Sequence, residues 1–159
     1  MKIKVVAVGK IKEKYLADAV AEYAKRLSHY CKLEIVELPD ERTPDSASEA
    51  EETQIREREG ERILRKIPEG AYVIALAIDG QAPDSVEFAR QMERWNVDGV
   101  SQMIFVIGGS LGLSKAVLAR ADYRLSFSRL TFPHQLMRVI LLEQIYRSYR
   151  IRNHEPYHK

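Results

Sequence analysis

Apolar residues along this chain alternate between short continuous runs and longer segments in which they recur every three to four positions. Residues 71–78 and 103–107 are apolar at every position, and such runs fit strands that are covered on both faces in a parallel sheet. Residues 2–9 are rich in β-branched side chains and end at a glycine, as a strand does where it stops at a turn. The pattern predicts strands at residues 2–9, 33–38, 71–78, 103–107 and 122–126.

The segments between these strands have helical spacing. In residues 13–30, apolar side chains recur every three to four positions, which is typical of a helix with one buried face. Asp84, followed three residues later by Glu87, forms a capping-box pattern that predicts a helix start. Helices are predicted at about 13–30, 47–66 and 84–95, as a short turn after Ser114, and over about twenty residues from Pro133.

Repeated strand–helix units predict an α/β fold with a mainly parallel sheet and helices on both faces. The chain has 159 residues, and we expect them to form one domain, residues 1–159. Hydrophobic residues make up 45%, which argues against disorder, and no apolar run approaches the roughly 20 residues needed to span a bilayer. The single cysteine, Cys31, excludes an internal disulfide. We therefore expect a cytoplasmic protein without a signal peptide, a membrane anchor or a metal.

The predicted last helix carries large apolar residues on two sides. At 100° per residue, one side combines the polar residues His134 and Arg138 with three apolar residues, and the other combines Leu136, Val139 and Ile140 with charged residues. A helix at the surface of a monomer should be apolar on one side only. We expect one side to pack on its own sheet and the other on a second subunit, which predicts a homodimer; the alternative is a deeply buried central helix.

Charge is unevenly distributed. The whole chain has a net charge of +2, but residues 115–159 contain nine Lys/Arg and three Asp/Glu, and three of the four histidines. This basic block is either a solvated helix or a site for a polyanion such as RNA. In the tail, Tyr157 and its neighbours suit stacking on a nucleobase, whereas Pro156, which lies between His154 and His158, disfavours a helical metal site.

Two loops are candidate ligand sites. Residues 107–114 (IGGSLGLS) follow a buried strand, and glycines there let a ligand approach the backbone beyond the carboxyl ends of the strands. The glycine spacing matches neither G-x-G-x-x-G nor a phosphate-binding P-loop. Residues 125–134 (LSFSRLTFPH) combine aromatic side chains, hydroxyls and an arginine that could wrap a small ligand. A glycine turn without a ligand remains the alternative for the first loop, and an ordinary strand–helix connection for the second.

Taken together, these segments closely resemble the RlmH family, the 23S rRNA (pseudouridine-N3)-methyltransferases of the SPOUT superfamily. The resemblance covers the whole chain, including its length. It is carried by the VGKIK start at residues 8–12 and by residues 105–112 (FVIGGSLG), 130–136 (LTFPHQL), 143–147 (EQIYR) and 156–159 (PYHK).

The resemblance implies an α/β fold with a C-terminal trefoil knot, which sequence physics would not predict because knots are nearly absent among folds. It implies a homodimer whose last helices pack together, and methylation at N3 of a pseudouridine in 23S rRNA of the assembled ribosome. It also implies S-adenosyl-L-methionine as methyl donor. The cofactor-binding positions that match are Leu76, Gly108, Phe127, Ser128, Arg129, Leu130, Thr131 and Phe132.

The chemistry of this reaction suggests catalytic roles for four residues. The N3 proton of a uracil ring must be removed before the nitrogen attacks a methyl sulfonium, so a base that titrates near neutral pH is needed. We expect His134 or His158 to be that base, Arg138 to stabilise the developing anion, and Tyr157 to stack on the nucleobase. The basic block would dock on the ribosome through contacts that weaken with salt.

Two alternatives remain. One is a non-catalytic ribosome- or RNA-binding factor that has kept the SPOUT fold. The other is a nucleotide-dependent oxidoreductase of the doubly wound type, against which the missing G-x-G-x-x-G counts. Titration with S-adenosylmethionine separates these possibilities.

Overall fold

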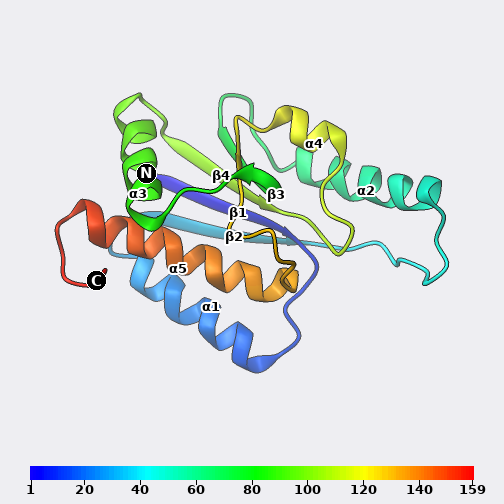
Figure 1. The fold of residues 1–159 in the computed structure, drawn as a ribbon, viewed down its shortest axis with the longest axis horizontal. Coiled ribbons are helices and arrows are strands. Elements are labelled where there is room, and N and C mark those ends of the chain that lie inside the picture. The colour runs from blue at the N-terminus through cyan, green and yellow to red at the C-terminus, as the bar shows by residue number, and fades with distance from the viewer.

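Five parallel strands form the sheet at the centre of the computed structural model, which describes residues 1–159 (Figure 1). The spatial order is β2-β1-β4-β3-β5, and every neighbouring pair is parallel. The sheet predicted as mainly parallel is therefore parallel throughout. The strands are β1 (Lys2–Val8), β2 (Lys32–Leu38), β3 (Tyr72–Gln81), β4 (Gln102–Ile107) and β5 (Tyr123–Leu125).

Helices cover both faces of this sheet, as predicted (Figure 1). Helices α1 (Lys14–Leu27), α3 (Ser85–Val97) and α5 (His134–Arg152) pack on one face. Helices α2 (Glu49–Leu64) and α4 (Lys115–Arg120) pack on the other. No helix combines the length and the apolar character that a bilayer crossing requires. The α/β class is confirmed.

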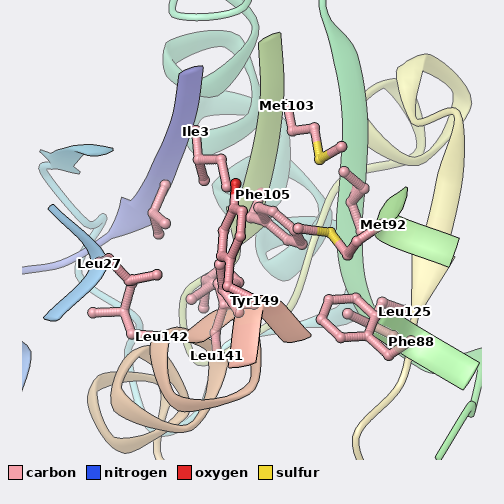
Figure 2. Close-up of a cluster of buried hydrophobic side chains, with 14 of the residues drawn as sticks. Ile3, Leu27, Phe88, Met92, Met103, Phe105, Leu125, Leu141, Leu142 and Tyr149 are labelled. Carbon is pink, nitrogen blue, oxygen red and sulfur yellow. The ribbon is translucent and has the colours of Figure 1, made fainter. Parts of the chain in front are cut away.

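The continuous apolar runs divide their side chains between the two faces. Phe105 of β4 belongs to the larger core with α1, α3 and α5, whereas its neighbours Ile104 and Val106 belong to the smaller core with α2 and α4. Figure 2 shows the larger core, in which Leu141 and Leu142 of α5 gather with Phe105 under the sheet. Each fully buried side chain of this size contributes about 1.5–3 kcal/mol through removal from water.

Local signals for the helix starts are confirmed. Asp84 accepts a hydrogen bond from the backbone N–H of Glu87, whose carboxylate accepts one from the N–H of Asp84. Ser114 accepts from the backbone N–H of Val117 at the start of α4. The expected end of the third strand at residue 78 is wrong: β3 continues to Gln81, because it pairs with Leu125 again beyond a register shift.

Helix α5 buries one of the two sides expected from its sequence. Arg138, Leu141, Ile145 and Tyr149 are buried, whereas Leu136 on the other side is 37% exposed. Because all five strands run parallel, their carboxyl ends lie at one edge of the sheet, and α5 begins at that edge beside Gly9. The first turn of α5 is therefore positioned next to the loops that follow the strands.

Candidate functional site

A pocket of about 660 Å³ lies at the carboxyl edge of the sheet. Three segments line it: residues 76–78 in β3, residues 107–112 from the end of β4, and most of residues 125–134 from the end of β5 to the start of α5. Met137 closes the wall from the first turn of α5. The volume lies within the range of small-molecule sites, about 300–1,000 Å³, and more than half of the lining residues are hydrophobic.

The glycine loop after β4 turns back on itself within four residues. The N–H of Gly112 donates to the carbonyl oxygen of Gly109 at 3.1 Å, and Gly112 has a φ of +83°, which favours glycine. A Cβ placed on Gly108 would lie 2.9 Å from the carbonyl carbon and oxygen of Gly112. Gly108 must therefore lack a side chain for the loop to close.

Seven of the eight expected cofactor-binding residues line this one pocket, although three separate segments of the chain supply them. The exception is Arg129, which is exposed and absent from the lining. The seven lining residues are Leu76, Gly108, Phe127, Ser128, Leu130, Thr131 and Phe132.

Hydrogen bonds within residues 126–130 hold the third segment against β3. The N–H of Ser126 donates to the carbonyl oxygen of Gln81 at 2.7 Å, and its hydroxyl donates to the carbonyl oxygen of Ser128 at 3.2 Å. The hydroxyl of Ser128 accepts from the N–H of Leu130 at 2.9 Å. Leu130 remains 72% exposed at the pocket wall. This segment is shaped by its own turn and keeps an apolar side chain available to a ligand.

His134 is the only histidine that lines the pocket. Its pKa lies below the usual 6.5, because burial disfavours the charged ring and the nearby Arg138 guanidinium repels it, while Asp40 partly opposes this. The imidazole is therefore neutral near pH 7. A neutral ring at the pocket wall can accept a proton.

Arg138 lies one turn further along α5 but does not line the pocket. Its side chain is 1% exposed, and its guanidinium donates to the Glu37 carboxylate at 2.6 Å and to the carbonyl oxygen of Gly9 at 3.1 Å. The Nε atom of Arg138 has no partner. Through these contacts the guanidinium connects α5 to the ends of β1 and β2, one helical turn from His134.

Tyr157 and His158 are held along the second half of α5, away from the pocket. The hydroxyl of Tyr157 donates to Glu143 at 2.7 Å, and Arg147 lies 4.6 Å from the centre of the Tyr157 ring and 3.0 Å from Nδ1 of His158. Burial and the Glu143 carboxylate raise the pKa of Tyr157 to about 12. Glu143 is nine residues beyond His134, about 13 Å along a helix. Within one chain, the four candidate catalytic residues are not brought together.

Several residues of the site escaped sequence reasoning. Glu59 of α2 is 4% exposed, accepts from the N–H of Glu41 at 2.9 Å, and would lie 3.2 Å from a Cβ at Gly109. Burial raises the pKa of its carboxyl. Its position midway between Ile55 and Ile63, the buried isoleucines of α2, was the signal that could have found it. Nothing in the sequence marks Glu37 as the partner of Arg138.

Two solved structures share the fold. A probable methylase family protein from Haemophilus influenzae Rd KW20 matches 99% of this chain and 70% of its own length, with a TM-score of 0.53 and 12% identity. A putative methyltransferase from Legionella pneumophila, in complex with the bound cofactor SAM, matches 94% of this chain and 66% of its own length, with a TM-score of 0.52 and 12% identity. At this identity the likeness concerns the fold alone.

Sequence relatives are much more similar. Proteins named ribosomal RNA large subunit methyltransferase H from Clostridium perfringens, Clostridioides difficile and Listeria monocytogenes are 60%, 62% and 58% identical, each over 100% of both chains. Residues 1–158 match the family described as "Predicted SPOUT methyltransferase". The family resemblance noted from the sequence motifs is thereby confirmed, and this chain belongs to the SPOUT methyltransferase family.

Proposed function

We propose that this chain is an S-adenosyl-L-methionine-dependent methyltransferase that methylates N3 of a pseudouridine in 23S rRNA of the assembled ribosome. One observation carries the proposal: identity of about 60% over the full length of proteins named ribosomal RNA large subunit methyltransferase H. Family membership supports methyl transfer, and the relatives' name supports rRNA of the large subunit as substrate. The choice of N3, pseudouridine and the assembled ribosome comes from the resemblance of the motifs.

The pocket fits S-adenosylmethionine. Its volume suits a nucleoside with a short side chain, its walls are mostly apolar, and the glycines at residues 108, 109 and 112 let a ligand approach the backbone closely. Leu76, Gly108 and the segment from Phe127 to Phe132 would hold the cofactor. When bound, the cofactor supplies an electrophilic methyl group on a sulfonium, which becomes a neutral thioether after transfer.

His134 is the base in this proposal. The imidazole would take the N3–H proton before the nitrogen accepts the methyl group that the cofactor would supply, so that the methylated ring ends neutral and the imidazole ends protonated. The lowered pKa of His134 supports this role, because the ring is neutral and ready to accept a proton near pH 7. Solvent then removes the proton.

Arg138 is a positioning residue in this proposal. Its buried guanidinium donates to Glu37 and to the carbonyl oxygen of Gly9, so that it acts on the site through His134 and the end of β1. An anion-stabilising role would require the guanidinium to leave the Glu37 carboxylate. Tyr157 would stack on the nucleobase, and His158 remains the second candidate for the base.

A homodimer would bring these groups together. The tail that carries Tyr157 and His158 lies far from the pocket of its own chain, and Leu136, next to that pocket, is 37% exposed. Packing of the exposed side of α5 against a second copy would cover Leu136, Val139 and Ile140. The partner's tail could then reach the pocket. Such a dimer would work in the cytoplasm, where assembled ribosomes are found.

The test is transfer of labelled methyl groups to ribosomes from a strain that lacks the modification, followed by mapping of the modified base. We expect one methyl group at N3 of a single pseudouridine in 23S rRNA. Tyr157→Ala, which removes the ring proposed to stack on the nucleobase, and His158→Ala should lose transfer and keep S-adenosylmethionine binding by calorimetry. Binding to ribosomes without transfer would instead indicate a non-catalytic factor, and full activity of both variants would remove the tail from the catalytic site.

A further inference from the structure

The basic block at residues 115–159, with nine Lys/Arg, is partly neutralised inside the fold. Four of its arginines form ion pairs with carboxylates, and the guanidinium of Arg138 is among them and buried. A guanidinium that already faces a carboxylate adds little field at the surface. The pairs are Arg120–Asp122, Arg138–Glu37, Arg147–Glu143 and Arg150–Glu155.

Uncompensated positive charge also lies in residues 9–14, which run from the end of β1 to the first residue of α1. Lys10 and Lys12 are exposed and take part in no ion pair. Lys14 pairs with Asp18 at 2.7 Å, yet its side chain remains 88% exposed. Glu13 is the one acidic residue among them. This lysine loop therefore presents a net positive surface.

The lysine loop is anchored beside the pocket. A Cβ on Gly9 would lie 3.2 Å from Nε2 of His134, which lines the pocket. The N–H of Ile11 donates to the Glu37 carboxylate at 3.0 Å, the same carboxylate that binds Arg138. Glu37 thus ties the loop to the first turns of α5. The loop's charges are held next to the site where the proposed reaction takes place.

We propose that the lysine loop binds the phosphate backbone of the RNA beside the target nucleotide, with Lys10 and Lys12 as the phosphate contacts. This inference rests on the proposed function, since it names how the substrate docks at that same site. Arg129, exposed on the pocket segment between Ser128 and Leu130, supplies a further cation to the same polyanion. Tyr15, 71% exposed at the start of α1, can stack on an unpaired base.

Phosphate contacts have a signature that a structural role lacks. Each contact releases counterions, so the logarithm of the binding constant falls with the logarithm of salt concentration, by about 0.7–0.9 per phosphate neutralised. Removing two contacts should weaken binding at low salt and flatten this dependence. A change in folding or in cofactor affinity would weaken binding at all salt concentrations alike and would leave the slope unchanged.

The experiment compares two double variants that remove equal charge. Lys10→Gln/Lys12→Gln changes the lysine loop. The matched control, Lys2→Gln/Lys66→Gln, changes two exposed lysines at the opposite edge, where β1 begins and where the Lys4 ammonium donates to the carbonyl oxygen of Lys66. Binding to ribosomes is measured over a series of salt concentrations. S-adenosylmethionine binding and thermal unfolding are measured on the same samples.

We expect Lys10→Gln/Lys12→Gln to bind ribosomes about tenfold or more weakly at low salt, with a slope lower by about 1.5. The control should stay within about twofold, and both variants should bind S-adenosylmethionine like the parent chain. The proposal is overturned if the two variants lose equal ribosome affinity, or if Lys10→Gln/Lys12→Gln leaves the salt dependence of binding unchanged. If the parent chain binds ribosomes but transfers no methyl group, the proposed function fails while the docking comparison is still decided by binding.

Discussion

Arg138 and Glu37 form a 2.6 Å ion pair across 101 residues of sequence, and it joins the last helix to the end of the second strand. The two partners differ in their surroundings. The arginine side chain is 1% exposed, whereas the glutamate side chain is 37% exposed. The glutamate therefore has water as an alternative partner, and the arginine does not.

This asymmetry predicts unequal costs when either partner is removed. Glu37→Ala leaves a buried guanidinium unpaired and should lower the free energy of unfolding by about 3–5 kcal/mol. Arg138→Met removes the buried charge and keeps similar volume, so it should cost about 1–2 kcal/mol. Urea unfolding of both variants measures the difference. Arg138→Met as destabilising as Glu37→Ala would contradict this account.

Gly108 and Gly112 should respond differently to a methyl group. A Cβ at Gly108 would press on the Gly112 carbonyl at 2.9 Å, so Gly108→Ala should open the loop and weaken S-adenosylmethionine binding at least about tenfold. A Cβ at Gly112 meets nothing within 4 Å, and its φ of +83° costs only about 1–2 kcal/mol of stability. Calorimetric titration and thermal unfolding of both variants separate the effects. Unchanged binding in Gly108→Ala would place the cofactor elsewhere.

His134 should titrate below pH 6.5. Because its folded pKa is lowered, the unfolded chain takes up a proton first as the pH falls through 6.5, and the free energy of unfolding decreases until the folded ring is also protonated. NMR titration of the imidazole gives the midpoint of its protonation. The ring signal is assigned as the one that is missing from the spectrum of His134→Gln. Arg138→Met should raise that midpoint, since Arg138 is one cause of the shift. A midpoint at or above 6.5 would show that burial does not control this ring.

The contact between Tyr157 and Glu143 can be read from tyrosine ionisation. Glu143 accepts the phenol's hydrogen bond and repels the phenolate, so Glu143→Gln should lower the pKa of Tyr157 from about 12. The measurement is tyrosinate absorbance against pH. The curve of Tyr157→Phe is subtracted from that of the parent chain, which isolates Tyr157 among the eight tyrosines. If Glu143→Gln leaves this titration unchanged, the tail does not rest on α5 in solution.

Local patterns were sufficient to predict most of the fold. The Asp84–Glu87 capping box placed the start of α3, and the continuous run that contains Phe105 indicated a strand covered on both faces. Both are decided by residues adjacent in sequence. The end of β3 was missed because Gln81 pairs with Leu125, and a contact 44 residues away leaves no trace in the run itself.

The candidate site was predictable only as a set of loops. The glycines around Gly108 and the segment up to His134 stood out, and parallel strands necessarily bring such loops to one edge. The pairing of charges was not predictable. Arg138 and Arg147 count equally in a sequence total, yet one is buried against Glu37 and the other is held by Glu143 on its own helix. The sum of charges over residues 115–159 therefore does not show which of these cations are free at the surface.

The parallel sheet also determines where a label can be inserted into the protein. Cofactor pocket, ion pair and lysine loop all occupy the carboxyl edge, so the turns before β3 and β4 at the amino edge carry no residue with a proposed role. Its turns at Gly70 and Gly99, before β3 and β4, have open space around them. A fluorophore or affinity tag inserted at either turn should report on ribosome docking from a distance, because exposed turn tips accept insertions most readily.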